Sequence, residues 1–151
     1  MKDKKDTWTR KEVAEITGIP DRRILFYTEQ PGLLLGMKTD TGRGTAREYS
    51  IGSIFYLLII KELSSLGLSL AKIKSIIWRI RAEKLLESWR DGEFAGKTIV
   101  MVIVPNDDNT NSALSASMHT LSSGDADFNL VADRPSQIII NLNKVFEKAK
   151  L

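Results

Sequence analysis

The chain has 151 residues, a length that allows one domain or two small ones and excludes a large multidomain enzyme. It carries 22 basic and 19 acidic side chains, a formal net charge of +3, and its hydrophobic fraction of 42% is sufficient for a folded core. Cysteine is absent, which excludes disulfide scaffolds, zinc fingers and thiolate metal sensors. The single histidine, His119, cannot build a catalytic triad or a multi-histidine metal site, so we expect no metal, no cofactor and no enzymatic activity.

The charged start of the chain and the shortness of its apolar runs indicate a protein of an aqueous compartment. The first six residues are charged rather than apolar, so no signal peptide is expected. The longest apolar run, residues 54–60, is far shorter than the roughly 20 residues of a membrane span. We therefore expect a cytoplasmic protein that does not enter a membrane.

Charge is divided unevenly along the chain. Residues 1–81 carry 15 basic and 9 acidic side chains, a balance of +6, whereas residues 82–151 carry 7 and 10, a balance of −3. A basic front half followed by an acidic back half predicts two modules. The basic module is the candidate for binding a polyanion.

The first predicted elements are two short helices joined by a tight turn. Thr9 and Glu12 have the spacing at which a hydroxyl and a carboxylate cap each other's backbone amides at a helix start. Gly18 can adopt the positive φ that a tight turn requires. Asp21 suits the first turn of a second helix because its charge complements the helix dipole, and this helix is expected to run to about Glu29.

A polar segment and two further helices follow. Residues 36–49 contain three glycines and predict an exposed loop or hairpin. Ser50 is placed to cap a third helix, whose apolar residues recur at helical spacing as far as Gly67. Ser69 is placed to cap a fourth helix, which either continues past Arg81 or restarts near it.

A second apolar stripe extends this fourth helix. Trp78, Ala82, Leu85 and Trp89 recur at spacings of four, three and four residues, which is the seam spacing of paired helices. We expect a linking helix over residues 82–93. Its stripe packs either on a second copy of the chain, as a dimerisation helix, or within the chain.

The last part of the chain, residues 94–151, predicts a small α/β module. Thr98–Val104 is a β-branched run that is apolar on both faces, which indicates a buried strand. Residues 113–121 fit either a helix or a strand, because the spacing of their large apolar residues suits a helix but their serines do not. The remaining predicted elements are strands at 128–131 and 137–142 and a helix at 143–150.

The first half of the chain contains an ordered set of short matches to a known family. They are Thr9–Ala14, Thr17–Ile19, Arg22, Phe26–Tyr27, Gly32–Leu34, Arg47–Ser50 and Leu63–Ile73. At these spacings, residues 8–80 resemble the DNA-binding domain of the MerR family of transcriptional regulators. The resemblance implies a mainly α winged helix-turn-helix domain over residues 1–81. It also implies a homodimer on near-palindromic, double-stranded promoter DNA, with RNA polymerase a candidate partner at the promoter.

The second helix departs from the family pattern. The family usually has a basic residue, two tyrosines and an acid where this chain has Leu25, Phe26, Tyr27 and Thr28. Phe26 cannot donate a hydroxyl to phosphate. One backbone contact that the resemblance implies is therefore not expected here.

The candidate DNA contacts follow from the resemblance and from side-chain chemistry. Arg22 and Arg23 are expected in the first turn of the recognition helix, where a guanidinium can contact guanine in the major groove; the alternative is that both are solvated surface charges. Tyr27 either contacts phosphate or packs in the core. Arg47 either contacts phosphate or braces the wing. The candidate phosphate contacts from the first helix and the wing are Thr9, Arg10, Lys11, Lys38, Arg43 and Arg47.

The predicted function is a dimeric, sequence-specific transcription regulator of the MerR type. Two alternatives remain open: an architectural or recombination factor similar to an excisionase, and an adaptor whose winged domain binds protein. The absence of cysteine excludes the thiolate metal and redox sensors of the family. The module at 94–151 can serve dimerisation, protein docking or the binding of a small effector. The operator, the effector and the sign of regulation do not follow from the sequence.

Overall fold

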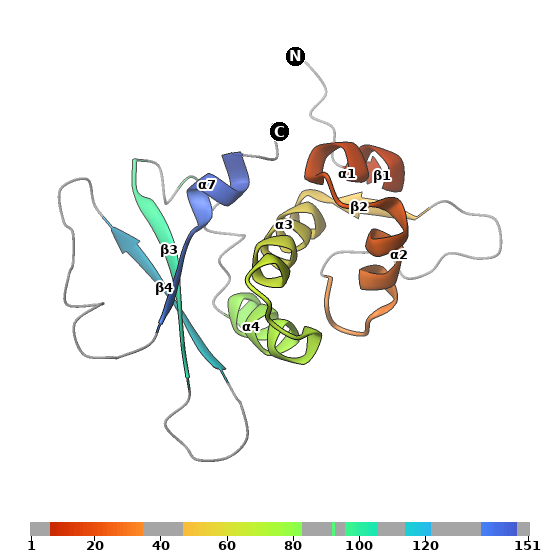
Figure 1. Ribbon diagram of the computed structural model, residues 1–151. Coiled ribbons are helices and arrows are strands. Elements are labelled where there is room, and N and C mark those ends of the chain that lie inside the picture. The colour runs from red at the N-terminus through yellow and green to blue at the C-terminus, as the bar shows by residue number, and fades with distance from the viewer. Residues whose placement is uncertain are drawn as a thin grey trace. The chain divides into compact units, whose positions relative to one another are not determined.

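The structure is a computed structural model that describes part of the chain, and two compact units emerge from it (Figure 1). The residues it describes are 7–34, 47–82, 92, 96–105, 114–121 and 137–147. One unit, called here the N-terminal unit, comprises Met1–Leu66 and Phe146–Leu151. The other, called the sheet unit, comprises Gly67–Val145.

The N-terminal unit combines three helices with a two-stranded ribbon. Its elements are β1 (Thr7–Thr9), α1 (Arg10–Thr17), α2 (Asp21–Glu29), β2 (Glu48–Ser50) and α3 (Ile51–Ser65). β1 and β2 pair in antiparallel orientation, with Trp8 opposite Tyr49. This pairing, which the sequence analysis did not predict, fixes the starts of α1 and α3 beside each other.

Local signals in the sequence account for the helix starts of this unit. The Thr9 backbone amide donates to Glu12 Oε2 at 2.8 Å, and the Glu12 amide donates to Thr9 Oγ1 at 3.4 Å, so the predicted capping box is confirmed. Gly18 has φ +66°, and its amide donates to the Ala14 carbonyl at 2.9 Å, which turns the chain into α2. Ser50 accepts from the α3 backbone as its N-cap.

The helix α3 forms the centre of the N-terminal unit. Residues 53–60 are all buried, and Leu63 is buried as well. A helix that is apolar all round must be enclosed by other elements. The elements in contact with it include α1 and β2, whose Val13 and Tyr49 are buried to 0% exposure.

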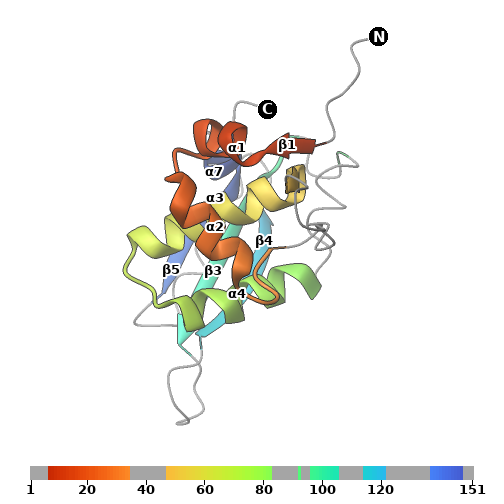
Figure 2. The ribbon, with the colours of Figure 1, turned by 90° about the vertical axis from the view of Figure 1, so that its right-hand side faces the viewer.

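The sheet unit contains one helix and three antiparallel strands. They are α4 (Leu70–Ala82), β3 (Thr98–Pro105), β4 (Leu114–Leu121) and β5 (Ile138–Asn141). Figure 2 shows β3 between β4 and β5, in the order β4-β3-β5. The helix α4 packs against β4. The three strands lie within residues 94–151, the range predicted to form a small α/β module, whereas α4 precedes that range.

The central strand β3 is buried on both faces, as its sequence predicted. Ile99, Met101 and Ile103 alternate with Val100 and Val102, and all five are buried. Across the ladder, Met101 lies opposite Met118 of β4 and Ile140 of β5. The buried residues of α4 that complete this unit are Ile73, Ile76, Ile77 and Ile80.

The last described helix, α7 (Leu142–Glu147), spans the division between the two units. Asn143 fixes its start to β3, because its Nδ2 donates to the Lys97 carbonyl at 2.9 Å and its Oδ1 accepts from the Ile99 amide at 2.8 Å. Phe146, which belongs to the N-terminal unit, stacks on Phe55 with ring centroids 4.3 Å apart. α7 therefore contributes to the packing of both units.

Most predicted elements of the back half are confirmed where the structure describes them. The strands predicted at 98–104 and 137–142 correspond to β3 and β5, and the helix predicted at 143–150 corresponds to α7. The ambiguous segment 113–121 forms the strand β4. The predicted strand at 128–131, the linking helix beyond Ala82 and the wing segment 36–46 lie outside the described residues.

The two compact units divide the chain at a different place from the predicted modules. We expected a domain boundary after residue 81, whereas the units divide between Leu66 and Gly67. The physical reason is that α4 packs against β4 and buries its isoleucines in the sheet unit. Compactness alone does not define a functional domain, so the boundaries at 81 and 93 stay predictions.

Candidate nucleic-acid interface

The helix α2 presents two arginines to solvent at its first turn. Arg22 and Arg23 are exposed, whereas Ile24 and Tyr27 are buried, Tyr27 to 6% exposure. The buried side chains fix the rotation of α2 about its axis, so the arginines must face outward. This is the arrangement expected of a recognition helix, in which the first turn approaches the base edges.

Two of the candidate contacts from α1 already have partners within the unit. The Arg10 Nε donates to Asp21 Oδ1 at 2.6 Å, and both side chains are about half exposed, at 42% and 49%. An ion pair this exposed contributes at most about 1 kcal/mol. Its effect is to connect the first residue of α1 with the first residue of α2. The Thr9 hydroxyl takes part in the capping box, whereas Lys11 is exposed.

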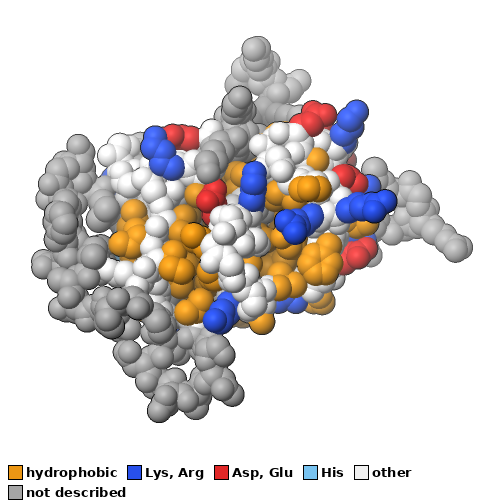
Figure 3. All heavy atoms as spheres, viewed as in Figure 1, with side chains coloured by type: hydrophobic (Ala, Val, Ile, Leu, Met, Phe, Trp, Pro, Cys, Tyr) orange, Lys and Arg blue, Asp and Glu red, His pale blue; other side chains and the backbone are white. Residues whose placement is uncertain are grey.

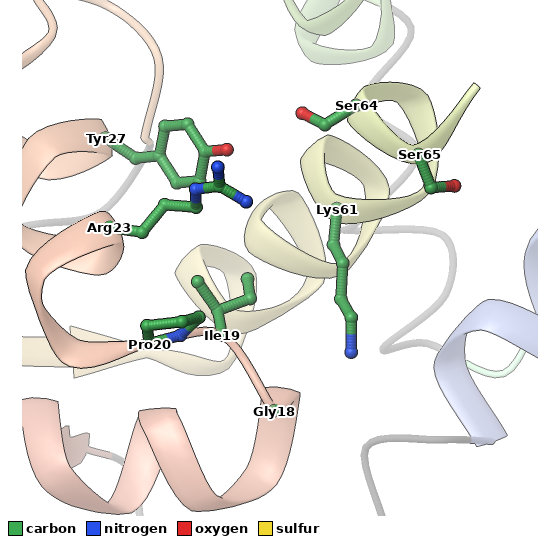
Figure 4. Close-up of a pocket in the computed structure, with 8 residues that line it drawn as sticks. All are labelled: Gly18, Ile19, Pro20, Arg23, Tyr27, Lys61, Ser64 and Ser65. Carbon is green, nitrogen blue, oxygen red and sulfur yellow. The ribbon is translucent and has the colours of Figure 1, made fainter. Parts of the chain in front are cut away.

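A pocket of about 360 Å³ opens between α2 and the end of α3 (Figure 4). Arg23 and Tyr27 extend into it from α2, and Ser64 and Ser65 come from the last turn of α3. The remaining lining residues are Gly18, Ile19, Pro20 and Lys61. The two cations and the hydroxyls of Tyr27 and Ser64 are donors suited to phosphate oxygens, whereas the Ser65 hydroxyl donates to the Glu62 carbonyl at 2.7 Å.

Lys61 is a residue of this pocket that the sequence analysis missed. Its Nζ donates to the Thr17 carbonyl at 2.8 Å, at the end of α1. The ammonium therefore satisfies a carbonyl of the last helical turn, where a positive charge is also favoured by the helix dipole. The sequence contains one signal for Lys61, which is the first charged residue after the uncharged stretch 51–60.

The residues after Arg23 connect α2 to the rest of the unit. Thr28 Oγ1 donates to the Ile24 carbonyl at 2.8 Å and lies 3.1 Å from the Tyr49 hydroxyl, which therefore donates to it. Thr28, at the position where the family usually has an acid, thus holds α2 against β2. Tyr27 is buried and also lines the pocket, so core packing accounts for most of its surface.

The remaining predicted contacts are Arg47, Lys38 and Arg43. Arg47 is partly buried, and its Nη1 is buried without a hydrogen-bond partner among the residues the structure describes. This position decides neither the phosphate contact nor the bracing role of Arg47, and both stay predictions. Lys38 and Arg43 lie outside the described residues.

The predicted dimerisation stripe is described only at its start. Trp78 lies on α4 in the sheet unit and is 63% exposed. Ala82 is the last residue of α4, and Leu85 and Trp89 lie outside the described part of the chain. The geometry of the stripe therefore stays a prediction.

Comparison with models of known protein families finds a match in the N-terminal part of the chain. Residues 9–78 match the family model described as MerR HTH family regulatory protein. Residues 9–78 therefore form a helix-turn-helix segment of the MerR type. The match includes the capping box, α2 and α3, and it ends within α4. No curated protein matches the chain.

The MerR helix-turn-helix match at residues 9–78 supports a DNA-binding transcription regulator, a class that is typically non-enzymatic. Among the described residues, no cluster of three or more histidine, cysteine, aspartate or glutamate side chains could hold a metal ion. The helices within the described ranges are also too short or too polar to cross a membrane.

Proposed function

We propose that the chain is a homodimeric, sequence-specific regulator that places α2 in the major groove of a near-palindromic promoter site. The observation that supports this most directly is the pair of exposed arginines, Arg22 and Arg23, at the first turn of a helix whose other side is buried. An arginine at this place can donate two hydrogen bonds to the O6 and N7 atoms of guanine.

Phosphate contacts on either side of α2 would set its position on the duplex. The pocket beside α2 supplies Arg23, Lys61 and the hydroxyl of Ser64, and Lys11 is exposed at the start of α1. In this proposal a wing carrying Lys38 and Arg43 contacts the DNA phosphate backbone on the opposite side of α2. Such contacts provide affinity and register, whereas the base contacts of α2 provide sequence preference.

The second copy of the chain is proposed to meet the first through the helix that begins as α4. Trp78 is exposed there, and the sequence continues its stripe through Ala82, Leu85 and Trp89. Two copies related by a two-fold axis would read two half-sites of a near-palindrome. RNA polymerase is a candidate further partner at the promoter.

The proposal is tested by replacing Arg22 and measuring sequence preference. A preferred duplex is first obtained by binding-site selection with the full chain. Its affinity is then compared with that of a scrambled duplex for the wild type and for Arg22→Ala. We expect Arg22→Ala to lose about 1–3 kcal/mol of this preference, the value of a good bidentate base contact. At saturation we expect two chains per duplex.

Lys97→Ala is the matched control, because Lys97 is exposed in the sheet unit and its replacement also removes one positive charge. It should leave the ratio of the two affinities unchanged. Circular dichroism checks that both variants are folded. A folded Arg22→Ala variant with the wild-type ratio would contradict the role of α2 as the recognition helix.

A further inference from the structure

Phe26 occupies the middle of the outward face of α2. It follows Arg22 by four residues and Arg23 by three, and residues at these separations are neighbours on a helix surface. All three side chains are exposed, and Phe26 has 48% of its surface in contact with solvent. The next residue on this face is Glu29, which is exposed at the end of the helix. The outward face of α2 therefore has an aromatic ring at its centre.

The ring of Phe26 is not part of the core of the unit. Its only described ring partner is Tyr27, whose centroid lies 5.7 Å away at an interplanar angle of 58°. The buried side of α2 is formed instead by Ile24 and Tyr27. In the space-filling view, hydrophobic side chains lie among those of Lys and Arg over the region where Figure 1 draws the helices of this unit (Figure 3).

The chemistry of the major groove limits what such a ring can recognise. A phenyl group has no hydrogen-bond donor, so it cannot replace the arginines as a partner of phosphate or guanine. Among the base edges in the major groove, thymine alone presents a methyl group, and apolar side chains contact it. Cytosine at the same place presents an amino group, which would lose its water against the ring.

We propose that Phe26 is a specificity-determining residue whose ring contacts the 5-methyl group of a thymine in the major groove. This inference rests on the proposed function, because it requires α2 to lie in the groove. Neighbouring side chains on a helix are about 5–6 Å apart at their Cβ atoms, and successive bases are about 3.4 Å apart along the duplex. The thymine therefore lies within about two base pairs of the guanine that Arg22 contacts.

A uracil scan of the selected duplex tests this contact with the unmodified full-length chain. Each thymine in turn is replaced by deoxyuridine, which removes the methyl group and keeps the base pair. We expect one position in each half-site at which the replacement weakens wild-type binding by about fourfold, the value of burying one methyl group. The other positions serve as internal controls.

The variants Phe26→Ala and Phe26→Leu assign the effect to this side chain. Phe26→Ala should bind the thymine and uracil duplexes equally and should keep its preference for the guanine contacted by Arg22. Phe26→Leu keeps an apolar side chain and should retain part of the thymine preference. Both replacements are at an exposed position, and the scan on the wild type does not depend on either variant folding.

The outcomes separate this inference from the function on which it rests. Wild-type protein without any sequence preference overturns both. Wild-type protein that prefers a site but tolerates uracil at every position, or that selects no thymine near the guanine, overturns the role of Phe26 alone. The same holds if Phe26→Ala keeps the full loss of affinity on uracil replacement.

Discussion

The surface of the N-terminal unit carries side chains that indicate a partner, whereas the distinctive residues of the sheet unit are buried. The N-terminal unit encloses the apolar helix α3 and leaves Arg22, Arg23 and Lys11 on its surface. The sheet unit encloses β3, whose apolar residues are buried on both faces. A partner can be inferred for the first unit because its exposed chemistry is distinctive. The buried residues of the sheet unit specify its packing and say little about what it binds.

The cores of the two units also differ in the sequence separation of the residues that contact each other. Backbone hydrogen bonds of α3 join residues close in sequence, as where the Leu66 amide donates to the Glu62 carbonyl, whereas β3 depends on β4 and β5, with Met101 opposite Met118 and Ile140. A sheet requires segments distant in the chain to meet before any of them is stable. Disrupting β3 should therefore damage folding without altering DNA recognition.

The largest effect is expected from Met101→Ala in the sheet unit. Met101 is fully buried in the central strand, so removing most of its side chain leaves a cavity and should lower the free energy of unfolding by about 2–5 kcal/mol. Urea denaturation followed by circular dichroism measures this loss. At a temperature where the variant is folded, its preference for the selected duplex over a scrambled one should equal that of the wild type.

Ile139→Ala provides the matched control for this prediction. Ile139 lies on the neighbouring strand β5 but is 46% exposed, so its replacement should change the free energy of unfolding by no more than about 0.5 kcal/mol. An unfolding energy of Met101→Ala equal to that of the wild type would show that β3 is not the core of this unit. An altered sequence preference would show that the two units do not divide their roles in this way.

A smaller effect is expected from Thr9→Ala in the N-terminal unit. The hydroxyl of Thr9 accepts from the Glu12 amide as part of the capping box, so its loss should cost about 0.5–2 kcal/mol of stability. Thr9→Ser keeps the hydroxyl and should be close to the wild type. If Thr9→Ala unfolds at the same urea concentration as Thr9→Ser, the cap does not stabilise α1.

Features set by neighbouring residues could be predicted from the sequence. The capping box of Thr9 and Glu12, the left-handed turn at Gly18 and the cap at Ser50 each depend on residues no more than four apart. The strand β3 could be predicted because a run of β-branched residues is apolar on both faces. The exposure of Arg22 followed from its charge, because arginine is almost never fully buried unless it is paired.

Features that depend on contacts between distant residues could not be predicted. The pairing of β1 with β2 and the hydrogen bond from Lys61 to the Thr17 carbonyl join segments about 40 residues apart. The serines of β4 obscured its conformation, which the ladder with β3 decides. The exposure of Phe26 depends on which neighbouring side chain fills the core, and Tyr27 does so.

The most direct test of the central claim is the salt dependence of duplex binding by the full-length chain. If the cations of the N-terminal unit neutralise phosphates, the logarithm of the binding constant falls linearly with the logarithm of salt concentration, with a slope of about −0.9 for each phosphate. We expect Lys61→Ala to make this slope shallower by about 0.9, and Lys97→Ala to leave it unchanged. Duplex binding that is absent or insensitive to salt would contradict the account and favour an adaptor that binds protein.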